Sequence, residues 1–113
     1  MTGLVGSSVN FTWTFSGQVL SILWGLKKDH GIDDNGKLVL LDRNGNSLSL
    51  PVPRSYIGRV SGRRHDDASS GQANFTLSSI TKHDERFYAC MIAPVNVLYP
   101  SYYDSVYLLV EGG

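Results

Sequence analysis

Few residues in this chain are of the types that carry out chemistry, and they are scattered. The three histidines, His30, His65 and His83, fall in segments that are typical of loops, where ordinary surface histidines are expected. The acidic residues at 29–35 suggest calcium, but their spacing does not match an EF-hand loop, so a solvated turn is favoured. The sequence contains no G-x-S-x-G, P-loop or G-x-G-x-x-G motif. We therefore expect no enzyme, no metal and no cofactor.

The remaining nucleophile is Cys90, which is the only cysteine in the chain. With one cysteine no intrachain disulfide can form. A reactive thiol needs an exposed, electropositive setting, whereas Cys90 lies in an alternating apolar segment. We expect a small, buried and inert side chain.

Length and charge restrict the class of protein. The chain has 113 residues, with ten Lys and Arg against ten Asp and Glu, so its formal net charge is zero. This length predicts one domain, over residues 1–111, with 112–113 as a linker or the end of the module. A balanced charge gives no electrostatic reason to expect nucleic acid or an anionic membrane as a partner. No stretch is apolar enough to span a membrane and no signal peptide is visible, which suggests a module cut from a larger protein.

The elements that must position any site are predicted to be β-strands. Residues 9–15 alternate apolar and polar side chains, which is typical of a half-buried strand. Turns are expected at residues 33–36 and at Asn44-Gly45, and a short helical turn at 81–85. The further expected strands, a pattern typical of a sandwich or barrel, are 20–26, 37–41, 47–50, 58–61, 74–77, 87–92 and 105–110.

Several motifs resemble those of immunoglobulin domains. Residues 84–90, Asp-Glu-Arg-Phe-Tyr-Ala-Cys, are similar to the D-x-x-x-Y-x-C signature of strand F. Trp24 resembles the strand C tryptophan, Arg59-Val60-Ser61-Gly62 the R-F-S-G of strand D, and residues 74–80 the F-T-L-x-x-I of strand E. The length between strands C and F favours the V-set.

The resemblance implies a fold and two contacts. The fold is an all-β, two-sheet antiparallel Greek-key immunoglobulin V-type sandwich. In the family the strand F tyrosine, here Tyr88, bonds back to upstream backbone, and the strand D arginine, here Arg59, pairs with the strand F aspartate, here Asp84.

The chain departs from the family pattern in strand B. The position that usually holds the strand B cysteine is Trp13, so the disulfide between strands B and F is absent. We predict that Cys90 packs as a free buried thiol between Trp13 and Trp24. Strand G lacks the F-G-x-G bulge of antigen receptors, and this combination resembles invertebrate surface receptors, including cnidarian allorecognition proteins.

Parity along the strands predicts which face is free to bind. Two N-x-[ST] sequons place Asn10 and Asn74 outward on the sheet that contains strands B and E, so glycans are expected there. The other sheet, G-F-C-C′, is predicted to expose an apolar patch, with either Val39 and Leu41 or Leu38 and Leu40 added from strand C′. The predicted outward apolar residues are Leu23, Phe87, Met91, Tyr107 and Leu109, and Ala89 shares their parity.

The loop between strands F and G, residues 93–103, is long, aromatic and stiffened by two prolines. Its residues Leu98 and Tyr99 are candidates for partner contact. Alternatively, they fold back and cap the open end of the sandwich. Both interpretations are compatible with the sequence.

Together these observations predict an extracellular protein-recognition domain that binds through its G-F-C-C′ face and F–G loop. Its role would be cell–cell recognition or adhesion, with a second copy as one partner to consider, and its parent a membrane-anchored surface protein. The alternative hypotheses are a secreted soluble immune-type lectin and a purely structural spacer domain.

Overall fold

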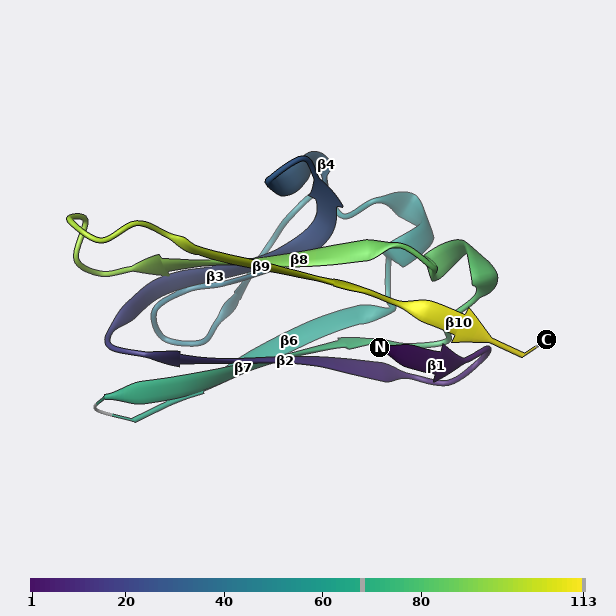
Figure 1. The fold of residues 1–113 in the computed structure, drawn as a ribbon, viewed down its shortest axis with the longest axis horizontal. Helices are drawn as coiled ribbons and strands as arrows, with labels where there is room; N and C mark the ends of the chain where they lie inside the picture. The colour runs from purple at the N-terminus through teal and green to yellow at the C-terminus, as the bar shows by residue number, and fades with distance from the viewer. Residues whose placement is uncertain (68, 113) are drawn as a thin grey trace.

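The computed structural model describes residues 1–67 and 69–112, and its regular secondary structure is almost entirely β-strand (Figure 1). Two short 3-10 helices, η1 (Arg54–Tyr56) and η2 (Lys82–Asp84), connect them. The strands are β1 (Thr2–Leu4), β2 (Val9–Ser16), β3 (Val19–Lys28), β4 (Gly31–Leu41), β5 (Ser47–Leu48), β6 (Val60–Asp66), β7 (Ser70–Leu77), β8 (Phe87–Pro94), β9 (Tyr102–Tyr107) and β10 (Leu109–Glu111).

The strands form two layers that pack face to face (Figure 1). One layer is a five-stranded sheet in the order β5-β4-β3-β8-β9, and the other is a three-stranded sheet in the order β2-β7-β6. A separate parallel pair joins β1 to β10. In immunoglobulin nomenclature β2, β7 and β6 are strands B, E and D, and β9, β8, β3, β4 and β5 are strands G, F, C, C′ and C″. The expected V-type sandwich without a disulfide is confirmed.

Aromatic side chains fill the space between the sheets. Phe11 lies with its ring centroid 5.1 Å from those of both Trp24 and Tyr88, and Trp24 stacks on Phe75 at 5.2 Å. All four side chains are fully buried or nearly so. Contacts of this kind add stability beyond the area they bury, about 0.5–1.5 kcal/mol per pair.

The turn expected at residues 33–36 does not reverse the chain. The reversal lies at Asp29–His30, where Asp29 has a φ of 55°, and residues 33–36 fall inside β4. The register jumps from Gly25–Lys37 to Lys27–Ile32, so these residues form a bulge. Inside the bulge the carboxylate of Asp33 accepts the backbone N–H of Asn35 at 3.0 Å. The turn-forming residues thus make a local turn within a longer hairpin.

Residues 62–66 and 70–71, which are mostly polar, lie in the paired strands β6 and β7, where only a short strand ending at 61 was expected. β6 is an edge strand, and charged side chains are suited to an edge because they deter pairing with another chain. The strand expected at 47–50 is shorter, and the one at 105–110 is divided between β9 and β10. The turn at Asn44-Gly45 and the helical turn at 81–85 are confirmed.

Candidate functional site

An apolar row crosses the outer face of the five-stranded sheet. Direct cross-strand pairs join Leu48 to Leu40, Leu40 to Leu23, Leu23 to Met91, and Met91 to Tyr103. Paired residues point to the same face of a sheet, and here the alternate residues of β3 and β4 point into the core. The apolar row therefore consists of one side chain from every strand, Leu48-Leu40-Leu23-Met91-Tyr103, with Leu48 exposed and the others half-buried.

A second apolar contact lies on the same face. Phe87 and Tyr107 are cross-strand partners whose rings meet edge to face at 4.8 Å. The ammonium group of Lys27 lies 4.8 Å from the centroid of the Phe87 ring, which is within cation–π range. Phe87 is nevertheless 48% exposed, so it remains accessible to a partner.

The hairpin between β3 and β4 covers the middle of this face. A Cβ at Gly25 would lie 2.4 Å from the carbonyl oxygen of Gly36 and 2.8 Å from Cγ2 of Ile32. Gly25 therefore allows the bulge in β4 to pack against the sheet. Ala89, the partner of Gly25, has the outward parity predicted for it but is fully buried.

The predicted contact residues do not form one continuous patch in the structure. It brings Leu23 beside Met91 and Phe87 beside Tyr107. Leu109 is exposed, but it lies on β10 opposite Thr2 and not in the five-stranded sheet. Three members of the apolar row were not singled out from the sequence: Leu40, Leu48 and Tyr103.

The sequence contains partial indications that these three residues belong to the apolar row. Of the two choices for strand C′, Val39 and Leu41 enter the core, and Leu40 remains half-buried outside. Leu38 is also buried, because it lies at the register shift between the pairs Trp24–Val39 and Gly25–Lys37. The sequence predicts Tyr103 at the end of the loop before strand G, whereas β9 begins one residue earlier, at Tyr102.

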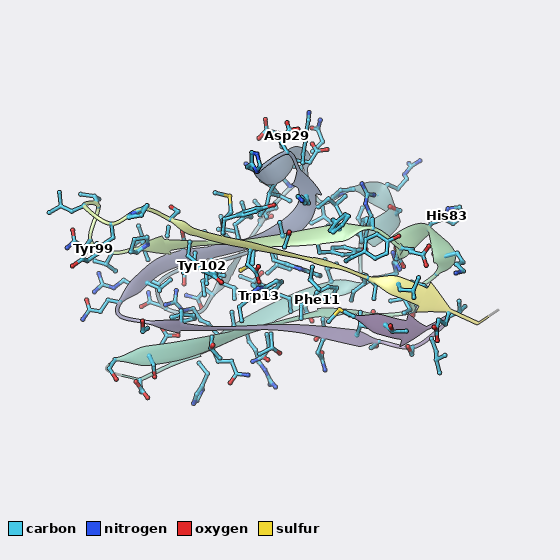
Figure 2. The ribbon with its side chains drawn as sticks, in the orientation of Figure 1. Phe11, Trp13, Asp29, His83, Tyr99 and Tyr102 are labelled. Atoms are coloured by element: carbon cyan, nitrogen blue, oxygen red, sulfur yellow. The ribbon has the colours of Figure 1, made fainter. Side chains whose placement is uncertain are left out.

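The tip of the β8–β9 loop projects from the end of the sandwich. Val97 is 90% exposed and Leu98 is 85% exposed, and Tyr99 is also exposed. Figure 2 shows Tyr99 at the extreme end of the molecule. The alternative in which these residues cap the open end of the sandwich is therefore wrong.

The outer face of the three-stranded sheet is polar and carries both sequons. Asn10 lies opposite Thr76 and Thr12 opposite Asn74, so each sequon faces the other across β2 and β7. The hydroxyl of Thr76 donates to Oδ1 of Asn10 at 2.7 Å, and that of Thr12 donates to Oδ1 of Asn74 at 2.8 Å. The two sequons thus form one hydrogen-bonded unit.

A hydrogen bond joins the two sheets near Cys90. Nε1 of Trp13 on β2 donates to Oδ2 of Asp104 on β9 at 2.7 Å. Asp104 is the strand partner of Cys90, and Trp24 is its partner on the other side. Figure 2 shows Trp13 and Phe11 between the two layers. The sequence does not predict this contact: Asp104 has the inward parity of Val106 and Leu108, but it lies one residue before the strand expected at 105–110, and its partner Trp13 is 91 residues away.

The Cys90 thiol is fully buried and free. Burial, assisted by the nearby Asp104 carboxylate, raises the pKa of this thiol to about 12. A thiol in this setting stays protonated at neutral pH, and the thiolate is the nucleophilic form. Cys90 therefore acts as a packing residue.

An ion pair between Arg59 and Asp84 lies at the other end of the sandwich from the β8–β9 loop. The guanidinium of Arg59 donates to both carboxylate oxygens of Asp84, at 2.7 and 2.8 Å. Asp84 is buried, and it also accepts the backbone N–H of Thr81 at 2.8 Å. The Tyr88 hydroxyl donates to the backbone carbonyl of Asp84 at 2.8 Å and lies 3.0 Å from the Tyr56 hydroxyl. Burial raises the pKa of Tyr88 far above its ordinary value.

Within residues 1–67 and 69–112, no three His, Cys, Asp or Glu side chains gather in a way that could hold a metal ion. Across the same residues, no helix is long and apolar enough to cross a membrane. The candidate site thus consists of an apolar row on one sheet, a polar face on the other and a projecting loop.

No family model and no curated protein matches the sequence. The fold is similar to that of solved structures. One comes from photo-crosslinking analyses of the multimeric cell-adhesive interactions of VGSC beta subunits, with a TM-score of 0.68 and 14% identity over 98% of this chain and 89% of that chain. Another is murine CRIg, with a TM-score of 0.66 and 14% identity over 99% of this chain and 92% of that chain. At this identity the likeness is one of fold.

Proposed function

We propose that this chain is an extracellular recognition domain that binds another protein through the outer face of its five-stranded sheet and its β8–β9 loop. The apolar row carries the proposal. Five neighbouring strands each place an apolar side chain on one line, with Leu48 exposed and the others half-buried. A contiguous apolar row on an outer face is typical of protein interfaces.

The role that fits is cell–cell recognition or adhesion, with a second copy of the chain as the first partner to test. The apolar row contains no charged side chain, so two copies that pair along it bury no charge of the row itself. A similar fold occurs in VGSC beta subunits, whose interactions are described as cell-adhesive and multimeric. An allorecognition-like role, with pairing between identical copies, belongs to the same proposal.

The polar face supports an extracellular setting. In both sequons the asparagine oxygen accepts a hydroxyl, which leaves Nδ2, the atom that carries an N-linked glycan, free to point outward. Glycans on Asn10 and Asn74 would cover the three-stranded sheet and leave the apolar row as the accessible face. We propose that the parent protein displays this domain outside the cell from a membrane anchor.

The proposal includes no enzymatic activity, cofactor or nucleic acid. The net charge is zero, and among the described residues no three His, Cys, Asp or Glu side chains gather in a way that could hold a metal ion. A secreted lectin is less well supported, because the apolar row offers aliphatic groups where a sugar would need hydrogen-bonding ones.

The test compares two aspartate variants on interior strands of the two sheets, β8 and β7. Met91→Asp places a charge in the apolar row, and Gln72→Asp places one on the polar outer face of β7. We expect self-association in sedimentation velocity, or binding to cells that display the protein, to fall at least about tenfold in Met91→Asp alone. If both variants are folded by circular dichroism and associate or bind equally well, the five-stranded sheet is not the binding face.

A further inference from the structure

A pocket opens at the end of the sandwich where the β8–β9 loop projects. Its volume is about 980 Å³, and it lies between the turn from β2 to β3 and the base of that loop. Phe15, Val19 and Ile92 contribute apolar walls, and Gln18, Tyr99 and Tyr102 lie around them. None of the lining residues carries a charge. A pocket of this size and lining is suited to an apolar group.

The same loop presents two exposed aliphatic side chains beside the pocket. Val97 and Leu98 are 90% and 85% exposed, the highest values among the large apolar side chains of the described residues. Two hydrogen bonds to Asn96 define a turn at the tip. The backbone N–H of Leu98 donates to Oδ1 of Asn96 at 3.0 Å, and the backbone N–H of Tyr99 donates to the backbone carbonyl of Asn96 at 3.1 Å. Ordered aliphatic groups held in water are favoured to bury themselves in a partner.

We propose that the tip of the β8–β9 loop of one copy inserts Leu98 into this pocket of a second copy, and that the second copy does the same in return. This inference rests on the proposed role in recognition and names the partner and the contact of the loop. A projection and a complementary hollow lie side by side on one end of one chain. A two-fold axis between two such ends pairs each projection with the hollow of the other copy.

Two features of the structure favour a second copy as the occupant. The pocket lining is uncharged, so inserting Leu98 buries no charged side chain of the lining. The loop tip and the C-terminus lie at opposite ends of the longest dimension, which is 45 Å (Figure 1). Copies held at their C-terminal ends on facing surfaces could therefore meet tip to tip.

The test uses a pair of complementary variants. Leu98→Asp places a negative charge on the tip, and Gln18→Lys places a positive charge at the mouth of the pocket on an exposed turn. We expect Leu98→Asp to weaken self-association by more than about tenfold and Gln18→Lys to weaken it less. An equimolar mixture of the two variants should regain association, because the carboxylate introduced on the tip of one copy would then meet the ammonium group introduced at the pocket of the other.

The control is Ile57→Asp, which charges an exposed aliphatic side chain in the loop after η1 and should leave association unchanged. Three outcomes would each overturn the tip contact: Leu98→Asp associates as strongly as the unmodified chain, the mixture of variants does not regain association, or the unmodified chain is monomeric. Because Leu98 and Gln18 lie outside the apolar row, these results are separable from those of Met91→Asp. If Met91→Asp weakens self-association and Leu98→Asp does not, the proposed binding face is supported and the proposed contact of the loop tip is refuted.

Discussion

The indole nitrogen of Trp13 donates a 2.7 Å hydrogen bond to the Asp104 carboxylate, and this bond connects β2 of one sheet to β9 of the other. It lies beside Cys90, where the usual immunoglobulin disulfide would connect strands B and F. A hydrogen bond to a charged group contributes about 1.5–3 kcal/mol, against about 2–5 kcal/mol for a small-domain disulfide. The link is therefore a partial replacement, and Phe11 and Phe75 supplement it by packing on the Trp13 ring.

The Trp13–Asp104 bond should be detectable as an energetic coupling. Trp13→Phe removes the N–H donor and keeps an aromatic ring, and Asp104→Ala removes the acceptor. We expect each variant to lower the free energy of unfolding by about 1.5–3 kcal/mol, and the double variant to lose clearly less than the sum. Urea denaturation of the four proteins measures the coupling. Additive losses would mean that the bond contributes nothing to stability.

The buried thiol predicts a dependence of stability on alkaline pH. Above about pH 8.5 the unfolded chain releases the Cys90 proton, whereas the folded chain retains it up to about pH 12. The unfolded state then binds fewer protons, so the free energy of unfolding falls as pH rises, by at most about 1.4 kcal/mol per unit. Between about pH 8.5 and 10, Cys90→Ala should remove this slope although it lowers stability overall. An identical slope in both proteins would contradict the assignment, as would rapid labelling of native Cys90 by a thiol reagent.

The Arg59–Asp84 pair should be sensitive to geometry as well as to charge. Arg59→Ala leaves the Asp84 carboxylate buried without its cation, and we expect a loss of about 3–5 kcal/mol. Arg59→Lys keeps the charge but cannot donate two parallel bonds, so an intermediate loss is expected. The exposed Arg54→Ala serves as the control and should change stability by less than about 0.5 kcal/mol. Full rescue by lysine would show that charge alone is sufficient.

Gly25 and Gly31 offer a matched test of the hairpin that covers the outer face. A Cβ at Gly25 collides with the carbonyl oxygen of Gly36, whereas one at Gly31 has only the carbonyl oxygen of Lys28 nearby, at 3.9 Å. We expect Gly25→Ala to cost about 1–3 kcal/mol in thermal or urea unfolding, and Gly31→Ala to be close to neutral. Equal stability of the two variants would mean that the bulge does not pack on Gly25.

The sequon pair predicts glycosylation at two neighbouring sites. After expression through a eukaryotic secretory pathway, Asn10→Gln and Asn74→Gln should each remove one glycan from the intact mass. Thr12→Ser retains the sequon and should keep both glycans, whereas Thr12→Val should lose the one at Asn10. A wild-type mass that does not change on glycosidase treatment would refute the assignment.

Much of the fold was predictable because its signals are local. Alternation along β2 and β8 and the motif around Tyr88 are carried by consecutive residues. The Asp104 contact and the apolar row could not be predicted in this way, because both depend on the register between strands that are far apart in sequence. The bulge at residues 33–36 misled the sequence-based interpretation for a related reason: its residues do form a turn, but only the pairing of β3 with β4 shows that the chain does not reverse there.

The parallel pairing of β1 with β10 has a mechanical consequence. When the two ends of the domain are pulled apart, the strands are drawn past each other along their length, so all hydrogen bonds between them are loaded at once. Once that pair yields, no covalent bond stops the sheets from separating, because the chain has a single cysteine. Under tension applied to its two ends the domain would then extend along its whole sequence, to a contour length of roughly 400 Å.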